Sequence, residues 1–202
     1  EIWKSSPAIL NTLLTIINEK IYKNGTEIKK VPLKVLISAS NETPPKGQGL
    51  EALYDRFLTR LHVPPTNERS SFELLLNSGG ASSEIRIPDN LVIKNEEWKK
   101  WKDEIKKVKL SDETLNIIHA IRLKFSENNK SKSFYVDVSD RRWLNATILL
   151  KAGAFFCDRD KTNIVDTLLL SHCLWTTNDN RKKGIEIVEK CVEDSGFDTG
   201  IS

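Results

Sequence analysis

The sequence predicts a mixed α/β segment followed by an all-α domain, and three observations support this. Residues 1–70 contain an amphipathic helical pattern, a hairpin signal and a short apolar strand pattern in succession. In the later part of the chain, apolar residues recur almost entirely at helical spacing. Between them lies NSGGASSE, whose small polar residues are typical of a linker. We therefore expect an α/β part at 1–70 and a helical bundle at 71–202, with the boundary near residues 64–80.

Composition narrows the classes of protein to which the chain can belong. Of its 202 residues, 39% are hydrophobic and 29% are charged, values typical of a soluble globular protein. The net charge of +3 is too small to predict a face that binds nucleic acid. No apolar run approaches the roughly 18 residues that a membrane span needs. We therefore expect no nucleic-acid partner and no membrane span.

The three cysteines, Cys157, Cys173 and Cys191, are widely spaced, and none lies in a C-x-x-C pair. They predict reduced core thiols in a cytoplasmic protein, with neither a disulfide framework nor a zinc site. His119 and His172 lack ligand partners at metal spacing, so no metal site is predicted. The chain contains no methionine, even at its first position, and we expect it to be a segment of a longer protein.

The first predicted element is a helix over residues 7–19. Ser6 is a favourable N-cap, and Pro7 suits the first helical position because that position leaves its N–H unpaired in any case. Apolar residues then recur at helical spacing. The next residues, IYKNGTEIKK, predict a hairpin with a type I′ turn at Asn24-Gly25, which would pair Lys23 with Thr26. The basic tip of this hairpin either contacts a partner or is simply solvated.

Residues 31–45, VPLKVLISASNETPP, predict a buried parallel strand around Val35–Ile37 that ends at Asn41. Ligands of open α/β sheets bind at the carboxyl edge of the strands, where Asn41 would hold a water or a phosphate oxygen. Asn is also a favoured turn residue, so Asn41 would alternatively only begin the turn into Pro44. Both interpretations remain open from the residues alone.

The segment LEALYDRFLTRLHV predicts a helix that runs into a short strand at 61–63 before two prolines. Its apolar stripe would be Leu50, Leu53, Phe57 and Leu61. Arg56 and Arg60 lie four residues apart on another face, a spacing usual for surface arginines.

The second part is predicted to form a small bundle of helices. A short helix is expected around 72–76, and Ser111 and Ser139 are expected to cap two of the longer helices. The others are expected at about 95–110, 163–174 and 181–193.

The cluster Ser139-Asp140-Arg141-Arg142 is the most informative polar stretch of this part. Two arginines in the first turn of a helix oppose its macrodipole, which favours anions there by about 0.3–1 kcal/mol. Either Asp140 compensates for this placement, or the arginines bind a phosphate. The residues alone do not decide between these two interpretations.

Four short strings follow one another along the chain: EIWK at the start, ASNE at residues 39–42, EALYDR at 51–56 and SDRRW at 139–143. Their order closely resembles that in the MoxR family of AAA+ ATPases, and within it the RavA-like branch. The resemblance covers nearly the whole chain. It implies a partial P-loop NTPase (AAA+) core, lacking its N-terminal strands, followed by a helical-bundle lid domain.

The resemblance also implies roles for single residues. Glu1 is similar to the glutamate at the end of the Walker B motif, which activates water, and Asn41 resembles sensor 1. Arg56 is similar to the arginine finger that reaches a neighbouring subunit's nucleotide, with Arg60 as the alternative. Arg141 resembles sensor 2, a lid arginine that contacts phosphate, with Arg142 as second choice. The hairpin at Asn24-Gly25 matches the insertion before sensor 1 that faces the pore of the ring.

The sequence departs from the family pattern in one respect, since it contains no G-x-x-x-x-G-K-[ST] motif. The resemblance therefore implies that the main ligands of ATP and Mg²⁺ lie upstream of Glu1. We expect this chain to be the carboxyl-terminal part of a longer ATPase and to be inactive alone.

The family resemblance implies a ring, expected to be a hexamer, that hydrolyses ATP to ADP and phosphate and remodels or activates protein partners in a chaperone-like way. It implies partners with von Willebrand factor A domains. The alternative is a non-catalytic scaffold or regulatory module derived from an ATPase.

Overall fold

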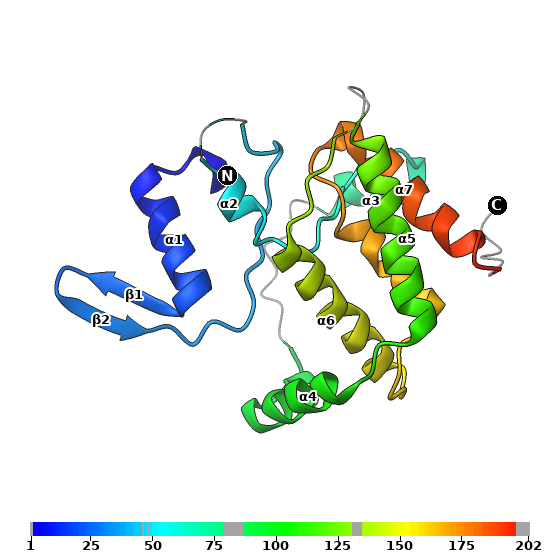
Figure 1. Cartoon of the computed structure of the whole chain (residues 1–202). Coiled ribbons are helices and arrows are strands. Elements are labelled where there is room, and N and C mark those ends of the chain that lie inside the picture. The colour runs from blue at the N-terminus through cyan, green and yellow to red at the C-terminus, as the bar shows by residue number, and fades with distance from the viewer. Residues whose placement is uncertain (1, 46, 48, 79–86, 131–134, 197–202) are drawn as a thin grey trace.

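A computed structural model describes residues 2–45, 47, 49–78, 87–130 and 135–196 of the chain (Figure 1). Figure 1 shows a helix and a hairpin on one side, and a bundle of helices on the other. The elements are α1 (Pro7–Glu19), β1 (Ile21–Asn24), β2 (Glu27–Lys30), α2 (Glu51–Tyr54), α3 (Arg69–Asn77), α4 (Asn95–Lys107), α5 (Asp112–Asn128), α6 (Asp140–Phe156) and α7 (Asn178–Glu193), with 3₁₀ turns at Ile2–Lys4, Asp89–Leu91 and Ile164–His172. This is the expected small α/β portion followed by a helical domain.

Helix α1 has the bounds that the sequence predicts. The Ser6 hydroxyl accepts a hydrogen bond from the Ile9 amide at 3.5 Å, and Pro7 is the first helical residue. The helix ends at Lys20, whose φ of 55° is left-handed and turns the chain directly into β1. Leu10 packs with Leu50 and Leu53 in a small cluster beneath α1.

The hairpin forms, but the predicted turn position is wrong by one residue. Asn24 pairs with Glu27 and Lys23 pairs with Ile28, so the two turn residues are Gly25 and Thr26. Gly25 has a φ of +60°, and Thr26 is not among the residues with positive φ. A glycine with positive φ at the first turn position is the signature of a type II′ turn, in place of the predicted type I′ turn.

The predicted buried strand at Val35–Ile37 is also wrong for this chain. Residues 31–40 form no strand and are mostly exposed, with Val35 68% and Ile37 85% accessible. The sheet in the described part of the chain consists of β1 and β2 alone. A buried parallel strand needs neighbouring strands to pair its backbone, and helices on both faces of the sheet to cover its side chains. These apolar residues therefore lie in an exposed segment without regular secondary structure.

The helix predicted from residue 50 is cut to the four residues of α2, and no strand follows at 61–63. Leu53 is buried as expected, but Leu61 is 76% exposed. The carbonyls of Phe57 and Leu58 accept hydrogen bonds from the Arg142 side chain on α6. Because these carbonyls accept hydrogen bonds from a distant side chain, residues 57 and 58 do not continue α2 despite their apolar helical spacing.

The helical domain packs around one apolar core between α5, α6, α7 and the 3₁₀ segment Ile164–His172. Its most deeply buried apolar residues include Ile121, Ala146, Leu150, Leu170, Val188 and Val192. Ser111 caps α5 by accepting from the Thr114 amide at 3.0 Å, and Ser139 caps α6 by accepting from the Arg142 amide at 3.1 Å. Both predicted caps are confirmed. The helix expected at 163–174 is instead a 3₁₀ segment, opened by a capping box of Asn163 and Asp166.

Among the described residues, no helix combines the length and apolar character that crossing a membrane requires.

The three cysteines are free thiols, but the prediction that all of them lie in the core is wrong for Cys157. Cys157 is exposed, whereas Cys173 and Cys191 are buried. Burial raises the pKa of Cys173 to about 11 and also raises the pKa of Cys191. A protonated, covered thiol reacts slowly.

We expect a thiol reagent such as DTNB to modify Cys157 quickly, and Cys173 and Cys191 only after denaturant is added. Immediate reaction of all three in native buffer would contradict this packing.

Candidate functional site

The candidate residues divide between the two parts of the molecule. Glu1 lies outside the described residues. Asn41 lies in an exposed bend after the extended segment, and not at the edge of a sheet. Beside it, the Ser40 hydroxyl accepts from the Glu42 amide at 3.2 Å, which is a local turn contact. Glu42 also approaches Lys4 at 3.8 Å, so this bend lies next to the beginning of the chain.

Arg56 follows α2 and is half-buried against α1. Its Nε donates to Asn18 Oδ1 at 2.7 Å, and its Nη1 donates to the Ala52 carbonyl. Burial lowers the pKa of Arg56, and the positive charge of Arg141 lowers it further. Arg141 itself is exposed in the first turn of α6. Two guanidinium groups therefore influence each other across the junction of the two parts, an arrangement that an anion would stabilise.

Arg142, the next residue, has an opposite environment and is 2% exposed. Its Nε donates to the Cys173 carbonyl at 2.5 Å and its Nη1 to the Asp55 carbonyl at 2.9 Å. Its Nη2 donates to the carbonyls of Phe57 at 3.0 Å and Leu58 at 2.7 Å. The Asp55 carboxylate lies 3.4 Å from Nη1. With these contacts, all five N–H donors of the guanidinium are used inside the protein.

The charge of Arg142 is thus compensated by Asp55, and not by Asp140 as one interpretation of the sequence held. Burial lowers the pKa of Arg142, while the neighbouring Asp55 charge opposes that shift. The second Asp55 oxygen accepts from the Ser139 hydroxyl at 2.7 Å, so one carboxylate joins the cap of α6 to the end of α2. Since Arg142 has no donor left for a phosphate in this arrangement, Arg141 stays the better candidate for sensor 2.

Arg60, the alternative finger, is also buried, at 7% exposure. Its Nη1 donates to the Trp175 carbonyl and its Nη2 to the Tyr54 carbonyl at 3.1 Å. Its guanidinium carbon lies 3.8 Å from the centre of the Tyr54 ring, a cation–π contact. Burial lowers the pKa of Arg60 to about 10, which leaves it charged at neutral pH. In this position Arg60 faces the helical domain, so Arg56 stays the better candidate for the arginine finger.

Together these contacts join residues 54–60 to the helical domain, and we call this set of contacts the arginine clamp. It consists of Arg142, Arg60, Asp55, Ser139 and Tyr54. The Tyr54 hydroxyl adds a hydrogen bond to the Thr176 carbonyl at 2.7 Å. Sequence reasoning missed the clamp, because its partners are about 80 to 120 residues apart in the chain. The one available signal was the unfavourable place of Arg142 at a helix start.

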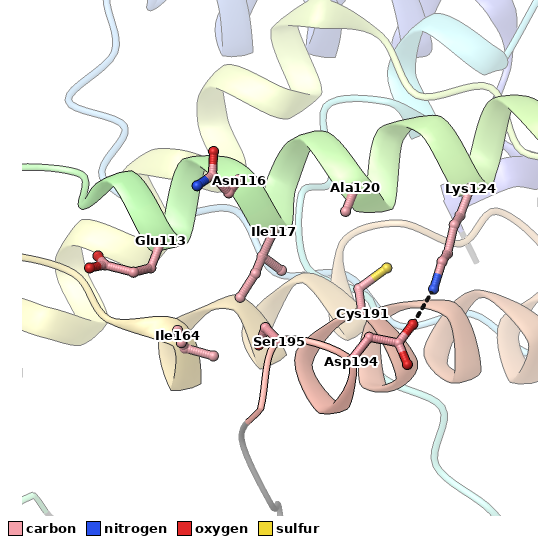
Figure 2. A pocket seen from close by; sticks show the side chains of 9 residues that line it. All are labelled: Glu113, Asn116, Ile117, Ala120, Lys124, Ile164, Cys191, Asp194 and Ser195. Carbon is pink, nitrogen blue, oxygen red and sulfur yellow. Dashed lines mark hydrogen bonds and ion pairs between the residues drawn. The ribbon is translucent and has the colours of Figure 1, made fainter.

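A shallow pocket of about 400 Å³ lies elsewhere, between α5, the 3₁₀ segment Ile164–His172 and the end of α7 (Figure 2). Figure 2 shows Lys124 and Asp194 in contact at one end of it, with Nζ 2.8 Å from Oδ2. None of the candidate residues lines this pocket. Of the described residues that line this pocket, Lys124 is the one cation and is paired with Asp194, and Glu113 adds a negative charge, so the lining does not favour a phosphate. Among the described residues, no group of three or more metal-ligating side chains is positioned to hold an ion.

Comparison with known proteins agrees with this architecture. Residues 1–103 match the family described as the MoxR domain in the MoxR-vWA-beta-propeller ternary systems, and residues 113–188 match the AAA lid domain. Two uncharacterized proteins of Methanocaldococcus jannaschii are 33% and 34% identical over 98% and 96% of the chain, which covers 50% and 47% of their lengths. The chain thus spans about half the length of these relatives.

A solved structure, that of a presumed ATPase from Cytophaga hutchinsonii, superposes with a TM-score of 0.58 at 18% identity. It covers 94% of this chain, and this chain covers 62% of it. At 18% identity this similarity shows the fold alone, which is that of part of an AAA+ core with its helical lid. The family match, which extends over half of the residues, shows more: the chain belongs to the MoxR family of AAA+ ATPases.

Proposed function

We propose that this chain is the catalytic and lid portion of an ATPase of the RavA-like branch, which hydrolyses ATP to ADP and phosphate and uses the energy to remodel or activate protein partners. The observation that carries the proposal is the pair of adjoining matches, a MoxR domain at 1–103 and an AAA lid at 113–188. The proposed division of the chain at about residue 70 leaves α1, the hairpin and α2 in the core, and α3 to α7 in the lid portion.

The proposed roles place charge and polarity around the transferred phosphoryl group. Glu1 activates the attacking water, Asn41 orients it as sensor 1, Arg141 contacts phosphate as sensor 2, and Arg56 stabilises charge in the neighbouring subunit's site. Catalysis of phosphoryl transfer depends mainly on such positioning and on cations near the developing negative charge.

The described residues of this chain fit a phosphate beside Arg56 and Arg141. Arg141 is exposed, and its charge disfavours protonated Arg56, so an anion between or beside them would relieve the repulsion. Mg²⁺ would supply further neutralisation of the phosphates, but no residue of this chain is proposed as its main ligand. The P-loop that cradles ATP is proposed to precede Glu1, and the 202 residues by themselves are expected to hydrolyse no ATP.

The proposed assembly is a cytoplasmic ring, hexameric as in the branch that it resembles, with the β1–β2 hairpin toward the pore. The matched family is named for systems in which a MoxR domain occurs with von Willebrand factor A and beta-propeller domains. We accordingly propose a protein partner with a von Willebrand factor A domain.

The proposal is tested by Glu1→Gln in the complete ATPase that carries this chain. The amide keeps the size of the side chain but cannot accept a proton from water, so we expect kcat to fall by about 10²–10⁴-fold. Binding of a fluorescent ATP analogue is expected to stay unchanged. Turnover at the native rate in Glu1→Gln, or no turnover in the complete native protein with any partner, would favour the scaffold alternative.

A further inference from the structure

We propose that Arg142 is a positioning residue for Arg56: through the arginine clamp it fixes the segment that carries the finger to the helical lid, so that the two move together. This inference rests on the proposed role of Arg56. It adds a residue to that role, and it makes the lid of one subunit a determinant of catalysis in the next.

The first support is the direction of the contacts around Arg56. On the N-terminal side, its own side chain reaches Asn18 of α1 at 2.7 Å. On either side of it along the chain, the backbone is held by the lid: the Asp55, Phe57 and Leu58 carbonyls all accept from the single buried guanidinium of Arg142. The Arg60 amide donates to the His172 carbonyl at 2.9 Å. The backbone on both sides of the finger is therefore anchored to lid residues.

The second support is the absence of regular structure in this segment. Helix α2 ends at Tyr54, so residues 57–63 have no strand or helix of their own to fix their path. A loop segment is placed by the hydrogen bonds it makes to other elements. Here a planar group with five donors binds three carbonyls of this segment at once, those of Asp55, Phe57 and Leu58, a geometry that a lysine cannot reproduce.

The third support is the neighbour of Arg142. Arg141, the proposed sensor 2, precedes it on the same turn of α6, and Ser139 of the same turn bonds Asp55 at 2.7 Å. A movement of the first turn of α6 in response to nucleotide would therefore be passed directly to residues 55–58. The state of a subunit's own site would then set the position of the finger it offers to its neighbour.

The test uses Arg142→Lys in the complete ATPase. The lysine keeps the charge but loses the fork, so we expect the finger to shift and kcat to fall by about 10²-fold, as for small displacements of catalytic groups. The Kd for ATP is expected to stay unchanged. Asp55→Asn, a milder change in the same clamp, is expected to lower kcat less.

Arg159→Lys is the matched control, because Arg159 makes a paired contact with Asp166 inside the lid at 2.8 and 2.6 Å, away from the clamp. Its kcat is expected to stay native.

Mixed rings distinguish a fault in the finger from a fault in a subunit's own site. Glu1→Gln subunits lack water activation but keep the finger, whereas Arg56→Ala subunits lack the finger but keep their own site. Mixing these two is expected to restore turnover at the interfaces where intact halves meet. If that mixture stays inactive, the proposed function fails at its trans-acting finger, whatever Arg142 does.

Subunits carrying Arg142→Lys are then mixed, in separate experiments, with Glu1→Gln subunits and with Arg56→Ala subunits. If it acts through the finger, turnover returns with Glu1→Gln subunits and stays absent with Arg56→Ala subunits. The reverse pattern would assign Arg142 to its own subunit's site and overturn the proposal. Recovery with neither variant would also overturn the proposal, since such a result would reveal general misfolding. If Arg142→Lys fails to assemble into rings, Asp55→Asn subunits are mixed with the same two variants, and the same two patterns decide the outcome.

Discussion

Replacing Arg56 by alanine in the complete ATPase is expected to lower kcat by on the order of 10³–10⁵-fold, the contribution usual for an arginine finger. The Kd for ATP should be almost unchanged, because the side chain acts on a neighbour's nucleotide and not on its own. Steady-state phosphate release and equilibrium binding of an ATP analogue measure the two quantities separately.

The comparison variant for Arg56 is Arg60→Lys. Arg60 is buried over the Tyr54 ring and bonded to the Trp175 carbonyl, so its replacement should lower stability more than it lowers turnover of the folded ring. Native turnover in Arg56→Ala, together with a large loss of kcat and native stability in Arg60→Lys, would move the finger to Arg60.

Replacing Arg142 by methionine is expected to lower the free energy of unfolding by about 3–5 kcal/mol, the range for removing one partner of a buried charge pair. Methionine fills much of the space, but it leaves the Asp55 carboxylate without its cation and the carbonyls of Phe57, Leu58 and Cys173 without donors. Total stabilities are commonly about 5–15 kcal/mol, so this change would remove a large share. Urea unfolding followed by tryptophan fluorescence measures it.

Arg141→Met provides the control for that measurement. Arg141 lies next to Arg142 on the same helical turn but is exposed, and an exposed substitution usually changes stability by no more than about 0.5 kcal/mol. Equal losses from the two variants would show that the first turn of α6 is sensitive as a whole, and that the hydrogen bonds of Arg142 are not the cause.

Local signals predicted the starts of α1, α5 and α6 because the causes lie within a few residues. Ser6, Ser111 and Ser139 each accept a hydrogen bond from an amide three residues later, so a cap and its partner are visible together in the sequence. The hairpin was visible for the same reason. Its register was not, because Asn24 and Gly25 both tolerate positive φ, and the structure uses only Gly25 in that way.

Distant partners explain what sequence reasoning missed. The Val35–Ile37 run has the composition of a buried strand, but such a strand forms only where neighbouring strands pair its backbone, and the described part of the chain provides no such neighbours. Similarly, Arg142 looked like a phosphate ligand because it opposes the dipole of α6. Three of the carbonyls that satisfy it lie 84 to 87 residues earlier in the chain and a fourth lies 31 residues later, beyond the reach of any local pattern. The roles of Glu1, Asn41, Arg56 and Arg141 stay predictions.

The exposed segment around Val35 and Ile37 has a consequence for the chain when it is handled alone. An extended backbone that presents unpaired N–H and C=O groups beneath bare aliphatic side chains is a template on which another molecule can add a strand. Such intermolecular pairing is the first step of cross-β aggregation. We therefore expect the purified 202-residue chain to associate at high concentration, opposed by the positive charges of Lys30 and Lys34, which precede this segment.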